Sequence, residues 1–149
     1  MQFLLLTICL MASSSFTQTK LQAGVTKLHL IQKIYVGEMG NSDEAARFRL
    51  LLEEELTKKG FAVSTKQENA DAILTGVLAL RVYADRSLAR ATVRLKSSAD
   101  DVIWSGDFQP KSALFKRGSD TVKFRAQDIA GKLRDDWKKS AKAAGIKPN

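Results

Sequence analysis

Histidine and cysteine, the side chains that most often act as bases, nucleophiles and metal ligands, each occur once in this sequence. His29 stands near the start of a predicted strand, and Cys9 lies inside an apolar run at the amino terminus. A catalytic triad or a metal cluster would need more such side chains than these. We therefore interpret His29 as a structural strand residue on a partly wet face.

Carboxylates could also do chemistry, as paired acids in glycoside hydrolysis or as metal ligands. The acidic runs are Glu53–Glu55, Asp100–Asp101 and Asp135–Asp136. Such chemistry needs carboxylates that converge across a cleft, whereas neighbours in a helix or a turn diverge. The closest glycine pair, Gly37 and Gly40, fits neither the dinucleotide fingerprint nor the phosphate-binding loop. The sequence thus predicts no catalytic residue, no cofactor site and no metal site, and the chain is interpreted as a non-enzyme.

Basic residues are the remaining candidates for a binding site. The chain has a net charge of +8, and from residue 111 onward it has 11 basic and four acidic residues, a net +7. A basic end could face phospholipid head groups, lipopolysaccharide, wall polymers or an acidic protein. Because loops carry function more often than helix backs do, Lys111, Lys116 and Arg117 in a Pro-containing loop are the candidate partner-binding residues. The solvated face of the last helix accounts for Lys132, Lys138, Lys139 and Lys142.

A second basic group marks a predicted hairpin: Arg81, Arg86, Arg90, Arg94 and Lys96. Nucleic-acid binding by a sheet needs exposed aromatic side chains on which bases stack, and Tyr83 is the only nearby candidate. We therefore expect an ordinary wet sheet face and no nucleic-acid partner.

The amino terminus predicts export. Residues Phe3–Ala12 form an apolar run of signal-peptide length, and Ser13–Ser15 supply small residues for cleavage. Residues 1–19 are interpreted as a signal peptide and 20–27 as a flexible lead, so the mature chain is expected in the periplasm or outside the cell, without a cysteine. A buried amino-terminal strand is the alternative, because no Lys or Arg precedes the run. Lipid anchoring through Cys9 is disfavoured, because Thr7-Ile8 precede it.

The rest of the chain, 28–145, is expected to form one α/β (α+β) domain, with 146–149 as a tail. Caps at Asn41–Glu44 and at Ser119 or Asp120 introduce two helices with one buried face each. The predicted order is β-α-β-β-β-β-α, a mainly antiparallel sheet of about five strands with both helices packed on one face. Its strands are Leu28–Val36, Phe61–Thr65, Ala72–Tyr83, Leu88–Ser97 and Val102–Phe108.

Two tryptophans, Trp104 and Trp137, fall on the apolar phases of their elements. Large aromatic side chains at such positions usually belong to the core. We expect both to be packing residues that touch across the layer between sheet and helix.

Short motifs resemble a group of bacterial envelope proteins. Ala70–Gly76 reads ADAILTG, Lys33–Val36 resembles the group's first strand, Leu52–Phe61 is a helix that runs into Gly-Phe, and Ala91–Trp104 is a hairpin that ends in Val-Ile-Trp. The group includes the curli-secretion lipoprotein, the lipoprotein activators of penicillin-binding proteins and the amino-terminal domain of the Tol-system periplasmic protein. The resemblance covers about Lys33 to Lys139. It implies an envelope domain that binds other proteins and that can form homo-oligomers, but it supplies no binding residues.

The favoured hypothesis is thus an exported envelope protein that binds a protein partner or assists assembly. One alternative is a small-ligand-binding protein or an accessory subunit of an enzyme. Another is direct binding to anionic envelope polymers through the basic carboxy-terminal region.

Overall fold

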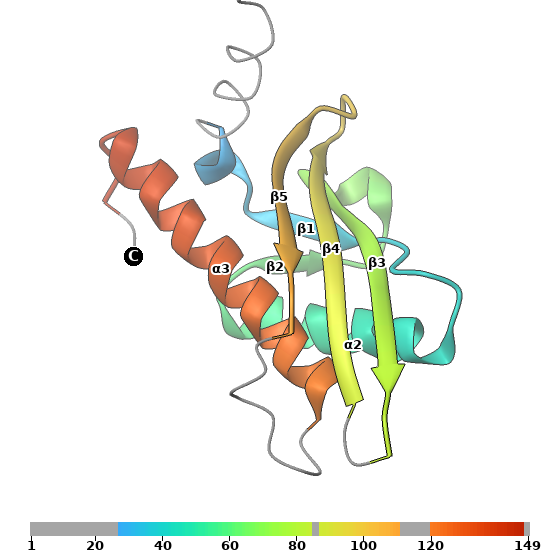
Figure 1. Cartoon of the computed structure of the whole chain (residues 1–149). Coiled ribbons are helices and arrows are strands. Elements are labelled where there is room, and N and C mark those ends of the chain that lie inside the picture. The colour runs from blue at the N-terminus through green and yellow to red at the C-terminus, as the bar shows by residue number, and fades with distance from the viewer. Residues whose placement is uncertain (1–26, 85–86, 111–119, 148–149) are drawn as a thin grey trace, which may run out of the picture.

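The computed structural model describes residues 27–84, 87–110 and 120–147. These residues form five strands, two α-helices and two short 3-10 helices (Figure 1). The strands are β1 (Lys33–Val36), β2 (Ala62–Ser64), β3 (Ala72–Val82), β4 (Ser87–Ser97) and β5 (Val102–Phe108). The helices are α2 (Asp43–Lys58) and α3 (Thr121–Ala143), and the 3-10 helices are η1 (Leu28–Leu30) and η2 (Gln67–Asn69).

The five strands form one mixed sheet in the order β2-β1-β3-β4-β5. The strand β1 is parallel to both β2 and β3, whereas β4 is antiparallel to β3 and to β5. The prediction of a mainly antiparallel sheet is therefore wrong. Helix α2 carries the chain from β1 to β2 as a crossover, which makes these two strands parallel, and the chain then returns through η2 to place β3 on the other side of β1.

The first predicted strand is shorter than expected. Residues Leu28–Leu30 form η1, and the strand begins at Lys33. Leu28 is buried, and Leu30 is 61 % exposed. Apolar residues at Leu28, Leu30 and Ile31 mimic a strand pattern, but this segment contacts α3 instead of entering the sheet.

Capping residues define the starts of both α-helices. The Ser42 hydroxyl accepts a hydrogen bond from the Ala45 N–H at 3.1 Å, and the Asp120 carboxylate accepts one from the Lys123 N–H at 3.1 Å. Both side chains satisfy backbone donors that have no partner within the helix. Gly60, just beyond α2, has a φ of +87°, a left-handed conformation that favours glycine. The predicted helix starts are confirmed.

The core lies between the sheet and the two helices. On β4 the side chains of Ala89, Ala91, Val93 and Leu95 are buried, and those between them face solvent. Helix α2 contacts β1, β2 and β3, α3 contacts β4 and β5, and the helices contact each other, so together they cover this buried face. Among the described residues, no element covers the opposite, open face of the β3–β4 hairpin.

A buried arginine completes the packing where β5 has ended. The strand β5 pairs with β4 only over Ala91–Lys96. Ala89 of β4, two residues before Ala91, lies beyond the end of β5. The Arg125 Nε of α3 donates to the Ala89 carbonyl at 3.0 Å, and the Arg125 Nη1 donates to Asp128 Oδ2 at 3.0 Å. The Arg125 side chain is 3 % exposed. Burial lowers the pKa of this guanidinium, which the Asp128 charge partly offsets.

The strands β3 and β4 approach closely at Gly76. A Cβ at this position would lie 2.4 Å from the Thr92 carbonyl oxygen and 2.8 Å from a methyl of Val93. Neither neighbour is the free end of a flexible side chain, so glycine is required for the hairpin to pack as it does. Within the described ranges, the helices are too short or too polar to cross a membrane.

Candidate functional site

The predicted partner-binding residues Lys111, Lys116 and Arg117 lie outside the described residues. The four lysines of the last helix are described, and all four are exposed on α3: Lys132, Lys138, Lys139 and Lys142. Two of them pair with the same carboxylate, because Lys132 Nζ lies 2.9 Å and Lys139 Nζ lies 3.5 Å from Asp136 Oδ1. The predicted exposure of these four lysines is therefore confirmed.

The described basic residues of the hairpin, Arg81, Arg90, Arg94 and Lys96, lie on its open face, whereas Arg86 lies outside the described residues. Arg90 pairs with Asp107 of β5 at 3.2 Å, and Lys96 pairs with Asp100 at 2.9 Å. Hydrogen bonds from Gln109, Arg90 and Thr92 hold the pKa of Asp107 below its usual range. Two of these cations are thus locally neutralised.

His29 is a structural residue, but it belongs to η1 and not to a strand. Its backbone N–H donates to the Ser140 hydroxyl at 3.2 Å, and its Nδ1 lies 3.0 Å from the same oxygen. Both contacts attach η1 to the end of α3. The side chain thereby helps to hold the amino-terminal segment against the last helix.

The acidic run Glu53–Glu55 forms local ion pairs and does not converge on a catalytic or metal-binding centre. Glu54 and Glu55 both approach Lys58, at 2.6 and 2.8 Å, and Glu53 accepts from Arg49 at 3.2 Å. Within the described ranges, no three or more His, Cys, Asp or Glu side chains come together in a group that could hold a metal ion.

Trp104 of β5 and Trp137 of α3 both lie near Asp136 of the last helix. The Trp104 indole is buried, its ring centroid lies 6.3 Å from that of Phe108, and its Nε1 donates to Asp136 Oδ2 at 3.1 Å. Asp136 directly precedes Trp137 in the sequence, so Trp104 contacts the last helix one residue before Trp137. Burial raises the pKa of Asp136, but the hydrogen bonds from Lys132 and Trp104 lower it more, to a net value below the usual range.

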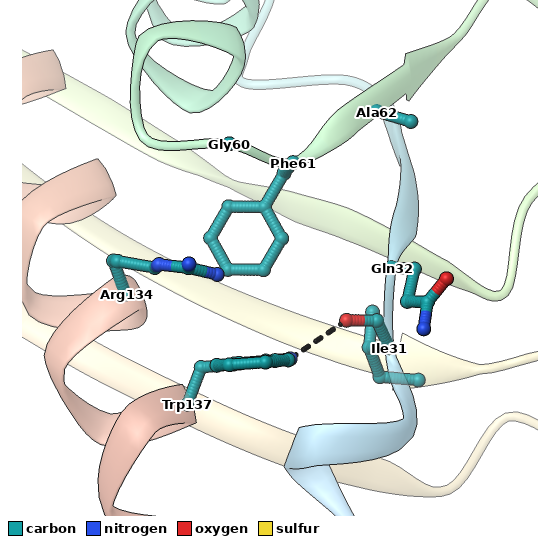
Figure 2. A pocket seen from close by; sticks show the side chains of 7 residues that line it. All are labelled: Ile31, Gln32, Gly60, Phe61, Ala62, Arg134 and Trp137. Carbon is teal, nitrogen blue, oxygen red and sulfur yellow. Dashed lines mark hydrogen bonds between the residues drawn. The ribbon is translucent and has the colours of Figure 1, made fainter. Parts of the chain in front are cut away.

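Trp137 packs against the core and borders an open hollow. Its Nε1 donates to the Ile31 carbonyl at 2.9 Å, which joins α3 to the segment between η1 and β1 (Figure 2). The hollow has a volume of about 290 Å³. Its lining comes from three parts of the chain: Ile31, Gln32, Gly60, Phe61, Ala62, Arg134 and Trp137.

A cation lies over two aromatic rings at the wall of this hollow. The Arg134 guanidinium carbon is 4.5 Å from the centre of the Trp137 ring and 5.7 Å from the centre of the Phe61 ring. Figure 2 shows the guanidinium stacked above the indole, with the Phe61 ring beside it. Such contacts fix a long side chain by cation–π attraction. The result is a preformed wall of one arginine and two aromatic residues.

A second hollow lies on the open sheet face beside Gly76 and has a volume of about 520 Å³. It mixes the acid Glu38 with the bases Arg94 and Lys96 and with two threonine hydroxyls. Opposite charges at its rim weaken any preference for an anion or a cation. The hollow beside Trp137 has the more specific lining, and we take it as the candidate site.

Sequence reasoning predicted the packing of Trp137 but missed Phe61 and Arg134 as its neighbours. The pattern predicts a strand over Phe61–Thr65, whereas β2 begins at Ala62 and Phe61 is a buried residue before it; no motif marks Arg134. The available signal was the spacing of Arg134 and Trp137, three residues apart on a helix and therefore on one face. Nothing in the sequence pattern shows that Phe61 and Gln32 meet that face.

The described residues form an α/β fold with a mixed five-stranded sheet and two α-helices. Neither a protein-family model nor a curated protein matches the sequence. Among solved structures, the chain is similar to PelC from Paraburkholderia phytofirmans, solved as a dodecamer, with 16 % sequence identity and a TM-score of 0.49. This match covers 71 % of the present chain and 86 % of the PelC chain.

Proposed function

We propose that this chain is a non-enzymatic, exported protein of the bacterial cell envelope that acts by binding another protein. The observation that carries the proposal is the hollow beside Trp137, with Arg134 stacked over the rings of Phe61 and Trp137. Tryptophan and arginine are the residue types most enriched among side chains that dominate protein–protein binding energy.

The size of the hollow favours a side chain as its occupant. Pockets for small molecules and cofactors usually measure about 300–1,000 Å³ and enclose most of the ligand. This hollow, of about 290 Å³, lies at the lower limit and is open to solvent. One apolar or aromatic side chain from a partner surface would fill it, with Gln32 and the Arg134 guanidinium at the rim.

Export places the partner in the envelope. The run Phe3–Ala12 followed by Ser13–Ser15 supports transfer across the inner membrane and cleavage of the leader. We expect intact-mass measurement of the exported protein to show cleavage after one of residues 12 to 23. Full-length protein that stays in the cytoplasm would contradict this part of the proposal.

The experiment on the hollow uses two glutamate variants. Ala62→Glu places a longer, charged side chain at an exposed lining position, and Thr65→Glu places the same charge just beyond β2, outside the hollow. Each tagged protein is crosslinked in intact cells, and the captured envelope proteins are quantified by mass spectrometry. We expect one discrete partner to be captured by the parent and by Thr65→Glu, and to be lost with Ala62→Glu.

Thermal melts of both variants control for folding, since both positions are exposed. Equal capture by all three proteins would remove the hollow from the binding argument. Capture of anionic polymers in place of a protein, weakened by salt, would favour the direct binding of envelope polymers instead.

A further inference from the structure

The edge of β3 that faces β1 is paired for only part of its length. Ile34–Val36 pair with Ala72–Leu74, and the chain after β1 extends this pairing. There Gly76 N–H donates to the Glu38 carbonyl at 3.1 Å, and Leu78 N–H donates to the Met39 carbonyl at 2.9 Å. The chain then enters α2 at Asp43, whereas β3 continues to Val82 (Figure 1).

Two residues in this last part of β3 direct their backbone groups outward. The N–H and C=O of a strand residue point to one side of the strand, and successive residues alternate. Leu80 and Val82 follow Gly76 and Leu78 at even spacing, so their backbone groups face the same edge. Across the described ranges, no residue makes a hydrogen bond with them there. An unpaired edge of this kind is a template for another strand.

The side chains at this edge alternate in character. Val82 is 76 % exposed and Leu80 is half-buried against the core, and both lie on the side of the sheet that the helices cover. Arg81 is exposed on the opposite, open face, and no described residue forms an ion pair with it. A strand added here would meet apolar side chains on one face and a cation on the other.

A second copy of this chain fits the edge poorly. The antiparallel register that pairs Leu80 with Val82 of the copy places Arg81 directly opposite Arg81, at a Cα separation of roughly 4.5 Å. Like charges directly opposite each other destabilise a strand pair. A shift that pairs Leu80 with Leu80 brings Val82 against Leu78, whose N–H already donates to Met39. These two registers of a second copy are therefore disfavoured, and the Arg81 cation favours a strand that places an acidic side chain opposite it.

We propose that the edge of β3 from Ala79 to Val82 binds an extended segment of another protein that carries an apolar–acidic–apolar triplet. The two apolar side chains lie beside Leu80 and Val82, and the carboxylate lies beside Arg81. Backbone hydrogen bonds give the affinity, and the alternation gives the specificity. This surface is separate from the hollow beside Trp137, so neither proposal requires the other.

The test uses two labelled nine-residue peptides that differ only at the centre, Val-Glu-Val and Val-Lys-Val, titrated with the purified chain by fluorescence anisotropy. We expect the parent to bind the Glu peptide about tenfold more tightly, a difference of about 1.4 kcal/mol. Arg81→Glu should reverse the preference. Arg94→Glu changes the same charge on the same open face, but on β4 opposite Thr75, and should keep the parental preference.

Amide hydrogen exchange locates the contact. Bound Glu peptide should slow exchange at Leu80 and Val82, and Val82→Pro, which removes only an outward-facing donor, should abolish binding without unfolding the hairpin. Absence of a preference for the Glu peptide, an equal effect of Arg81→Glu and Arg94→Glu, or protection elsewhere would each overturn the proposal. Ala62→Glu should leave peptide binding unchanged, so failure at the edge and failure at the hollow are separable.

Discussion

Trp137 joins the last helix to the segment before β1, and removing it measures how much that junction stabilises the fold. Its indole packs against the core, donates to the Ile31 carbonyl and lies under the Arg134 guanidinium. Trp137→Ala deletes all three interactions. Trp137→Phe keeps most of the ring surface and removes the indole donor.

The structure sets the size of each loss. Truncation of a buried tryptophan costs about 3–5 kcal/mol, and the half-buried position of Trp137 puts Trp137→Ala at the lower end, about 3 kcal/mol. Trp137→Phe should cost about 1 kcal/mol, the usual net value of one hydrogen bond. Arg134→Met should cost about 0.5–1 kcal/mol from the lost cation–π contact. In the Trp137→Ala background that last cost should shrink.

Urea unfolding followed by far-UV circular dichroism measures these losses, because the signal does not depend on the tryptophan that is removed. The midpoints should fall in the order Trp137→Phe, then Trp137→Ala, with an unchanged slope. A loss below about 1 kcal/mol for Trp137→Ala would mean that the indole is not packed. Trp137 would then be a free binding residue, and its role in the wall of the hollow would need revision.

Two further predictions use paired substitutions, and a third concerns the dependence of stability on pH. Arg125→Met leaves a β4 carbonyl without its donor and should cost about 1–3 kcal/mol in a denaturant melt. Asp128→Asn keeps a hydrogen-bond acceptor but removes the charge that partly offsets the burial of the Arg125 guanidinium, and because Asp128 itself is 55 % exposed the cost should be smaller, about 1 kcal/mol. Gly76→Ala should destabilise by about 1–3 kcal/mol through overpacking, but Gly131→Ala, with open space around its Cβ in the middle of α3, should stabilise by about 0.5–1 kcal/mol. The folded pKa of Asp136 is lowered, so the stability it contributes is present above its unfolded pKa of about 3.9 and is lost as pH falls through the folded pKa. Stability below pH 4 should therefore fall less steeply in Asp136→Asn than in the parent, and equal acid profiles would contradict this reasoning.

Local rules were enough for the elements whose signals are contained in neighbouring residues. The Ser42 hydroxyl and the Asp120 carboxylate cap helices where the sequence places them. The alternation of Ala89 to Leu95 with exposed residues gives β4 its buried face and its open face. Each of these signals is contained within one segment of the chain: the caps satisfy nearby backbone donors, and the alternation separates a side that meets water from a side that meets the core.

Strand direction could not be predicted in the same way, because it depends on which segments become neighbours. The two residues Ile34 and Tyr35 pair in parallel with β2 on one side and with β3 on the other, and no local pattern in β1 states this. The segment around His29 was misread for a similar reason. Its apolar alternation fits a strand, but Ser140, 111 residues away, holds it against α3.

The same limit applies to both proposed surfaces. The sequence predicts that the first strand ends at Val36 before a glycine, but only the structure shows that β1, Lys33–Val36, is much shorter than β3, Ala72–Val82. A short strand beside a long one leaves part of the longer edge unpaired, but only the sheet order makes β1 the neighbour of β3 and exposes Leu80 and Val82. Likewise, Phe61, Arg134 and Trp137 become a wall only when α3 lies across the start of β2. Both surfaces depend on segments that are distant in the sequence, and the edge of β3 also depends on the difference in length between β1 and β3. A substitution that alters only the local pattern of one strand or helix should therefore leave both surfaces intact, whereas a change in which segments lie side by side should remove them.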